Sequence, residues 1–103
     1  MDLSIVIPVY NSEKIIKNLI SQIINSVSDI KTINFYEIIL VDDCSTDNSW
    51  KQIKFLSEKF SFVNGIKLTE NFGQHNAIMC ALKEASGDKV ITMDDDLQHS
   101  PSS

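Results

Sequence analysis

Residues 36–43 of the chain, Tyr36-Glu-Ile-Ile-Leu-Val-Asp-Asp43 (YEIILVDD), set an unbroken aliphatic run directly before two adjacent carboxylates. Such runs are typical of strands that are buried on both faces, as the strands of parallel sheets are. Ser45 and Thr46 follow as candidate N-caps of a helix that carries Trp50 on its apolar side. The stretch therefore predicts a buried strand that leads into a helix, the repeating unit of α/β folds.

The same alternation extends in both directions from this stretch. Strands are expected at residues 3–9, 36–41, 63–68 and 89–93. Helices are expected where apolar residues recur at helical spacing, at residues 13–27, 50–60 and 77–85. Asn11 or Ser12 is the expected cap of the first helix, and Gly87 is expected to end the third in a left-handed conformation.

This alternation predicts an α/β fold, a three-layer sandwich in which a Rossmann-like parallel sheet lies between helices. With the usual strand order 3-2-1-4, the first and fourth strands are neighbours. Ligands of such sheets bind beyond the carboxyl ends of the strands. The polar clusters of this chain all follow strands, at residues 8–11, 42–43 and 94–96. We therefore expect these clusters to face one crevice.

Length and composition limit what the chain can be. A chain of 103 residues, 43% of them hydrophobic, forms one globular unit around one core. Its net charge of −5 and its pI near 4.8 argue against a nucleic-acid partner. Cys44 and Cys80 lie in dissimilar contexts, so reduced thiols and a cytoplasmic location are expected. No apolar segment has the length of a membrane span.

The acidic triplet Asp94-Asp95-Asp96 calls for a nearby cation, because adjacent carboxylates repel one another. In an extended strand, Asp94, Asp96 and Gln98 point to one side and offer oxygen ligands to a single ion such as Mg²⁺ or Mn²⁺. A diphosphate would complete the coordination of that ion. The alternative is a solvated acidic turn, which is common on protein surfaces.

Two further features each have a ligand-binding and a structural interpretation. Asp42 and Asp43 could bind a nucleotide base or ribose, or could lead into a helix whose first turn favours acids. Tyr10 could stack on a base or pack against the protein. The sequence contains neither the P-loop pattern GxxxxGK followed by Ser or Thr nor Cys/His spacing for zinc.

Three other classes of protein fit parts of this pattern. A receiver-like signalling domain also gathers carboxylates and magnesium at strand ends, but its acidic pair follows the first strand rather than the second. A nucleotidyltransferase of similar fold would open with a Gly-rich phosphate loop, which this sequence lacks. An EF-hand loop beginning at Asp94 would need Gly at its sixth position, where His99 stands.

Four segments carry a family resemblance; in chain order they are SIVIPVYNSE, EIILVDDCSTDNS, NFGQHNAIMCAL and GDKVITMDDDLQHSP. In order and spacing they resemble the first half of the nucleotide-binding domain of glycosyltransferase family 2, which has the GT-A fold. The resemblance covers essentially the whole chain. The last two segments are most similar to the polyprenyl-phosphate sugar transferases, such as dolichyl-phosphate mannose synthases and undecaprenyl-phosphate aminoarabinose transferases.

The resemblance implies a binding site for a nucleotide-diphosphate sugar, with UDP favoured and GDP second. Pro8 and Tyr10 would line the nucleobase pocket, and Asp43 would hydrogen-bond the base. The implied nucleotide-binding residues are Pro8, Val9, Tyr10, Asn11, Asp42, Asp43, Asp94 and Asp95. The implied ligands of Mg²⁺ or Mn²⁺ are Asp94, Asp96 and Gln98.

The resemblance also implies that part of the enzyme lies beyond residue 103. The acceptor would be a saccharide or a polyprenyl phosphate, which is already anionic at neutral pH and needs no general base. Residues 1–103 would then form the donor-binding half of an inverting glycosyltransferase of cell-envelope synthesis, located at the cytoplasmic face of the membrane. We expect this half to bind nucleotide without turnover.

The sequence differs from the family pattern at two places. Glu70 stands where family members often carry Arg, and the subgroup's ending DLQHPPE reads DLQHSPSS in residues 96–103. A last strand with an open edge invites pairing with another chain, so weak self-association is expected.

Overall fold

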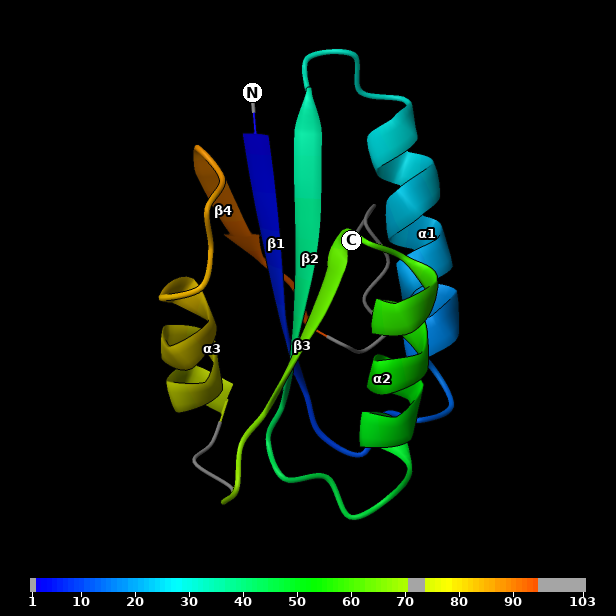
Figure 1. Cartoon of the computed structure of the whole chain (residues 1–103), viewed down its shortest axis with the longest axis vertical. Coiled ribbons are helices and arrows are strands. Elements are labelled where there is room, and N and C mark those ends of the chain that lie inside the picture. Colours follow the sequence, from blue (N-terminus) through cyan, green and yellow to red (C-terminus); the bar gives the residue numbers. More distant parts are fainter. Residues whose placement is uncertain (1, 71–73, 95–103) are drawn as a thin grey trace.

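The computed structural model describes residues 2–70 and 74–94 of the chain (Figure 1). Its elements, in order, are β1 (Asp2–Val9), α1 (Ile16–Ser28), β2 (Phe35–Asp42), α2 (Ser49–Lys59), β3 (Val63–Lys67), α3 (Gln74–Leu82) and β4 (Lys89–Thr92). This order confirms the predicted alternation of strands and helices.

The four strands form one parallel sheet in the order β3-β2-β1-β4, as predicted. The central strand β1 pairs with β2 on one side and with β4 on the other, so that Ile5 lies opposite both Ile38 and Ile91. The outer strand β3 pairs with β2, where Gly65 lies opposite Leu40. The chain leaves β1 toward β2 and returns beside β1 as β4, which makes the carboxyl edge between β1 and β4 the switch point of the sheet.

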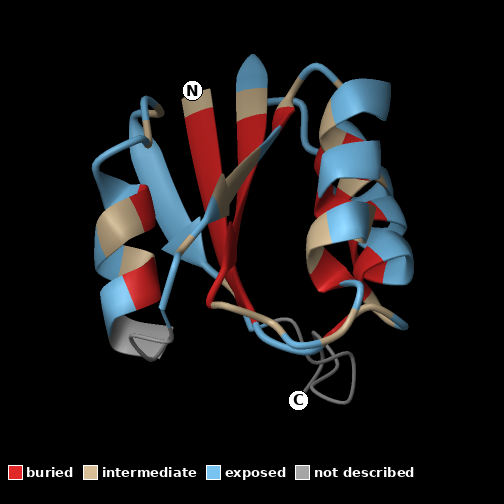
Figure 2. Cartoon of the chain, turned by 60° about the horizontal axis from the view of Figure 1, so that its bottom comes forward, coloured by how far each residue is buried: buried red, intermediate tan, exposed pale blue. Residues whose placement is uncertain are grey.

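The sheet lies between two helical layers (Figures 1 and 2). Helices α1 and α2 cover one face, and α3 covers the other. Because successive residues of a strand point to opposite faces, β2 contributes to both cores: Ile38 and Leu40 belong to the core with α1 and α2, whereas Ile39 and Val41 pack with α3. These four side chains are fully buried, which explains why β2 is aliphatic throughout.

The predicted helix caps are wrong. The N-cap residues are Ile15 of α1 and Asn48 of α2, and neither makes a capping side-chain hydrogen bond. At α2, the carboxylate of Asp47 accepts the N–H of Ser49 instead. The backbone carbonyl of Ser12 accepts hydrogen bonds from the N–H groups of Ile15 and Ile16. These bonds form a turn before α1, which begins at Ile16.

Gly87 is not a left-handed C-cap, because α3 ends at Leu82 and the φ angle of Gly87 lies outside the left-handed region. Glycine is required here because the backbone of β1 lies very close to this position. A Cβ atom at this position would lie 2.7 Å from the backbone nitrogen of Ser4 and 2.8 Å from its Oγ. Only glycine lets the chain entering β4 pass this close to β1.

β4 differs from the other strands in being exposed along its whole length. Val90 and Ile91 are 40% and 44% exposed, although they belong to a parallel strand, a class that is normally covered on both faces. An apolar groove of about 260 Å³ separates β4 from α1, and Ile91 and Met93 line it together with Ile23 and Ile30. None of the helices in residues 2–70 and 74–94 is long and apolar enough to cross a bilayer.

Candidate functional site

The polar segments that follow the strands meet at the carboxyl edge of the sheet. The N–H of Asp43 donates to the carbonyl of Val9 at 2.9 Å, which continues the β1–β2 pairing past the end of β1. On the other side of β1, the N–H of Met93 donates to the carbonyl of Val6 at 3.0 Å and brings the start of the acidic triplet to the same edge.

Asp42 and Asp43 are both buried, with 0% and 4% of their surfaces exposed. Oδ1 of Asp42 accepts a hydrogen bond from the N–H of Ser45, whereas its buried Oδ2 accepts none from the residues that the structure describes. A buried carboxylate oxygen without a donor costs free energy. Oδ2 of Asp42 is therefore an acceptor that a donor from outside these residues would satisfy.

The turn after β1 is exposed and held in a strained conformation. Tyr10 is 48% exposed, and Asn11 has a φ of 51°, in the left-handed region that few residues other than glycine adopt. Oδ1 of Asn11 accepts hydrogen bonds from the N–H of Thr46 at 2.8 Å and from its hydroxyl at 3.2 Å. The N–H of Asn11 donates to Oγ of Ser45 at 2.9 Å.

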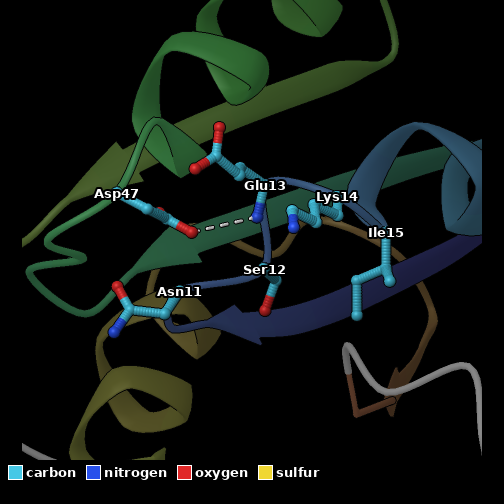
Figure 3. A pocket seen from close by; sticks show the side chains of 6 residues that line it. All are labelled: Asn11, Ser12, Glu13, Lys14, Ile15 and Asp47. Atoms are coloured by element: carbon cyan, nitrogen blue, oxygen red, sulfur yellow. Dashed lines mark hydrogen bonds between the residues drawn. The ribbon is translucent and has the colours of Figure 1, made fainter.

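Further hydrogen bonds tie the same two loops together. The N–H of Ser12 donates to the hydroxyl of Ser49. The N–H of Glu13 donates to the carboxylate of Asp47 (Figure 3). Burial would raise the pKa of Asp47, but hydrogen bonds from Ser49 and Glu13 outweigh it and hold that pKa below its ordinary value. Residues 11–13 and 45–49 thus form one interlocked surface beside the carboxyl edge.

A polar pocket of about 180 Å³ opens on this surface, lined by Asn11, Ser12, Glu13, Lys14, Ile15 and Asp47 (Figure 3). It is smaller than the pockets that hold drug-sized ligands. We therefore regard the open carboxyl edge, rather than this pocket, as the candidate site.

The structure distributes the predicted site residues unevenly. Pro8 and Val9 are buried in β1, whereas the side chains of Tyr10 and Asn11 are exposed beside them. Asp94 is exposed and follows β4. Asp95, Asp96 and Gln98 lie outside the described residues.

The donors proposed for a cation are all oxygen atoms, the type that Mg²⁺ and Mn²⁺ prefer. Within residues 2–70 and 74–94, no three His, Cys, Asp or Glu side chains gather closely enough to hold a metal ion. Of the predicted ligands, Asp94 is the one that the structure describes. A single carboxylate fits a site in which one or two carboxylates hold the ion and phosphate oxygens complete its coordination shell.

Sequence reasoning missed the residues that hold the Asn11 turn. Thr46 was predicted only as a helix cap, and no role was predicted for Asp47 or Ser49. Their partners lie on the other loop, 34 to 37 residues away. The available signal was the density of Ser, Thr, Asp and Asn in residues 45–49, because such side chains bond to nearby backbone.

A doubly wound parallel sheet with buried acids and an exposed polar turn at its switch point defines the class of α/β domains that bind ligands at their carboxyl edge. The comparison with protein families names the family. The family described as Glycosyl transferase family 2 matches residues 4–103, and the chain belongs to it. This assignment sets aside the signalling-domain and nucleotidyltransferase alternatives.

Curated relatives point to one branch of the family. The chain is 44% identical over 99 residues to the undecaprenyl-phosphate 4-deoxy-4-formamido-L-arabinose transferase of Proteus mirabilis, covering 95% of this chain and 30% of that protein. It is 40% identical over 101 residues to the dolichol-phosphate mannosyltransferase of Pyrococcus furiosus, covering 98% of this chain and 27% of that protein. The chain thus spans less than a third of the length of these relatives.

Two solved structures have a similar fold. S. aureus TarS 1-349 in complex with UDP superposes with a TM-score of 0.72 at 34% identity, over 93% of this chain and 28% of that chain. The mannosyltransferase PcManGT from Pyrobaculum calidifontis, solved with GDP-Man and Mn²⁺, gives a TM-score of 0.70 at 23% identity, over 91% of this chain and 27% of that chain. These similarities confirm the GT-A fold.

Proposed function

We propose that the chain is the donor-binding half of a metal-dependent glycosyltransferase that transfers a sugar from a nucleotide diphosphate, with UDP favoured over GDP. One observation carries the proposal: the exposed turn after β1, the buried acids after β2 and the start of the acidic triplet after β4 meet at one edge of the sheet. The complex of TarS with UDP supports the choice of nucleotide.

The base and ribose would bind on the β1–β2 side of the edge. Tyr10 presents an exposed ring there, and stacking on a nucleobase would cover it. Asp43 would accept a hydrogen bond from the base, with the buried Asp42 adjacent. Pro8, Val9 and Asn11 would shape the floor and rim of this pocket.

The diphosphate would bind on the β4 side. Asp94, Asp96 and Gln98 would hold Mg²⁺ or Mn²⁺, and Asp95 would contact the nucleotide. The bound ion would act as a Lewis acid that stabilises the negative charge of the departing nucleotide diphosphate. The acids would position that ion against the diphosphate.

The acceptor would be a polyprenyl phosphate or a saccharide, bound by a part of the protein outside this chain. The names of the bacterial and archaeal relatives, both transferases of sugars to lipid phosphates, favour the former. Residues 1–103 would therefore bind donor without turnover. The complete enzyme would be inverting, would work at the cytoplasmic face of the membrane and would serve cell-envelope synthesis.

Calorimetric titration of the chain with UDP and GDP, with and without Mn²⁺, tests the proposal. We expect binding that requires Mn²⁺, that favours UDP, and that is lost in Asp96→Ala. Asp29→Ala, which removes an exposed acid at the end of α1, is the matched control and should bind like the parent. Binding of Mn²⁺ that is indifferent to nucleotide, or equal loss in both variants, would contradict the proposal.

A further inference from the structure

The chain enters β4 through a hydrogen-bond cluster centred on one buried carboxylate oxygen. Oε2 of Glu37, in β2, accepts hydrogen bonds from the hydroxyl of Ser4 at 2.6 Å, from the N–H of Ser86 at 2.8 Å and from the hydroxyl of Ser86 at 3.0 Å. The hydroxyl of Ser4 in turn accepts the N–H of Gly87 at 2.8 Å. The cluster thus joins β1, β2 and the segment before β4.

The cluster lies where the register of β4 is set. Ser4 lies opposite Glu37 in β2 and opposite Val90 in β4, so one residue of β1 connects both neighbours. Gly87 packs so closely on Ser4 that a Cβ atom would approach the carbonyl carbon of Leu3 to 2.9 Å. This fit admits one alignment of residues 86–87 against β1.

Apart from its pairing with β1, β4 has few buried contacts. Within residues 2–70 and 74–94 it pairs with β1 alone, over Lys89–Thr92, and its residues are all exposed. Two further hydrogen bonds hold its ends: the N–H of Met93 donates to the carbonyl of Val6, and the N–H of Asp2 donates to Asp88 at 3.2 Å.

Glu37, by contrast, is 9% exposed. Burial would raise the pKa of its carboxyl group, but the hydrogen bonds from Ser4 and Ser86 outweigh burial and lower that pKa. A buried, charged acceptor with three donors is a strong anchor for a short edge strand.

We propose that Glu37 is a positioning residue for the cation end of the site: it locks the register of β4 and thereby fixes where Asp94 stands at the carboxyl edge. A shift of one residue would turn every side chain of β4 to the opposite face. Asp94 would then leave the side of the sheet on which the proposed cation is held. This inference rests on the proposed function for its ligand, but not for its effect on β4.

A purely stabilising role is the alternative, and a compensated variant separates the two. Glu37→Leu alone leaves the hydroxyls of Ser4 and Ser86 without their acceptor, which lowers stability. The triple variant Ser4→Ala, Glu37→Leu and Ser86→Ala removes those hydroxyls as well, and we expect it to melt closer to the parent. Because Ser4→Ala also removes the acceptor of the Gly87 N–H, the triple variant is compared with the double variant Ser4→Ala and Ser86→Ala, which keeps Glu37. Because the hydrogen bonds between Glu37 and residue 86 are still missing, β4 in the triple variant should remain less firmly held in its register.

Two measurements on the full chain test the proposal: hydrogen–deuterium exchange of residues 89–93, and calorimetric titration with Mn²⁺ and UDP. In both Leu-containing variants, we expect exchange to accelerate in β4 but not in β1–β3, and the affinity to fall roughly 10-fold to 100-fold, as for outer-shell residues of metal sites. Glu37→Gln, which keeps an acceptor oxygen but loses the charge, should bind and exchange closer to the parent than Glu37→Leu does.

Parent-like exchange of β4 in the triple variant, or parent-like affinity once its stability is restored, would overturn the positioning role. Failure of the parent itself to bind UDP with Mn²⁺ would instead refute the proposed function. The exchange of β4 still decides in that case whether Glu37 fixes the strand, so the two failures are distinguishable.

Discussion

Asn11 shows how one side chain can stabilise a strained backbone. Asparagine tolerates the left-handed region better than most residues, and its side chain can bond to nearby backbone. Here the φ of 51° turns Oδ1 toward Thr46 on the other loop, from which it accepts two hydrogen bonds. The residue therefore combines the conformation that the turn needs with the acceptor that joins the two loops.

Replacing Asn11 separates these two contributions. Asn11→Gly keeps the backbone conformation and loses the hydrogen bonds from Thr46, and we expect a loss of about 1 kcal/mol in the free energy of unfolding. Asn11→Ala adds the cost of alanine at positive φ, roughly another 1–2 kcal/mol. Urea denaturation measures both. If the alanine variant were as stable as the glycine variant, strain at this turn would not be significant.

Two lowered carboxyl pKa values predict how stability depends on pH. The pKa of Glu37 lies below its ordinary value of 4.5, and that of Asp47 below its ordinary value of 3.8. As pH falls through these values, the unfolded chain takes up protons before the folded protein does, so the free energy of unfolding decreases. The stabilisation is complete above the ordinary values and is lost as pH falls through the lowered ones.

Urea denaturation between neutral pH and about pH 3 checks this prediction. Glu37→Gln should lose less stability on acidification than the parent, because glutamine does not titrate. Asp29→Ala, which changes an exposed acid, should follow the parent's pH profile. An unchanged acid response in Glu37→Gln would contradict the assigned role of this carboxylate.

At the scale of the elements, β4 is the strand whose placement depends most on specific contacts. Gly87→Ala would push a Cβ atom against the backbone of Leu3 and Ser4, which cannot move without disturbing β1. Overpacking of this kind costs about 1–3 kcal/mol. We expect that loss in urea denaturation, together with faster exchange in residues 89–93. Lys83→Ala, which changes an exposed side chain in the same connection, is the matched control and should be as stable as the parent. Parent-like stability of Gly87→Ala would show that the approach is looser than described.

The elements themselves could largely be predicted from the sequence, because their signals are local. The aliphatic runs of β1 and β2 and the apolar spacing of α1 depend on residues close in the chain. The helix starts could not be predicted, because Asn11, Ser45 and Ser49 find their partners in a loop 34 to 37 residues away. The C-cap role predicted for Gly87 was wrong for the same reason, because its close neighbour, Ser4, is far away in the sequence.

The candidate site was predictable in position but not in detail. Parallel strands bring all their carboxyl ends to one edge, so the alternation of elements was enough to gather the turn after β1 with Asp42 and Asp43. Which side chains face outward depends on loop conformation. Pro8 and Val9 are therefore buried, whereas Tyr10 is exposed.

At the scale of the whole molecule, the exposed strand β4 leads us to propose weak self-association of residues 1–103. Among the residues that the structure describes, no strand pairs with its outer edge, and the apolar groove beside it contains Ile91 and Met93. Sedimentation velocity should show a concentration-dependent dimer that Ile91→Lys abolishes. Phe35→Lys, which changes an apolar side chain 59% exposed at the start of β2, should leave the dimer intact. A monomer at high concentration would contradict this proposal.

The central claim is that one nucleotide and one divalent cation bind together at the carboxyl edge of the sheet. Paramagnetic broadening of backbone NMR signals by Mn²⁺, with and without UDP, tests it most directly, because the broadening reports distance from the ion. With UDP present, we predict the strongest broadening at Asp43 and Asp94, and much weaker broadening at Phe35 and Lys89, which lie at the amino ends of their strands. Broadening that ignores UDP, or that centres on the amino ends of the strands, would contradict the account.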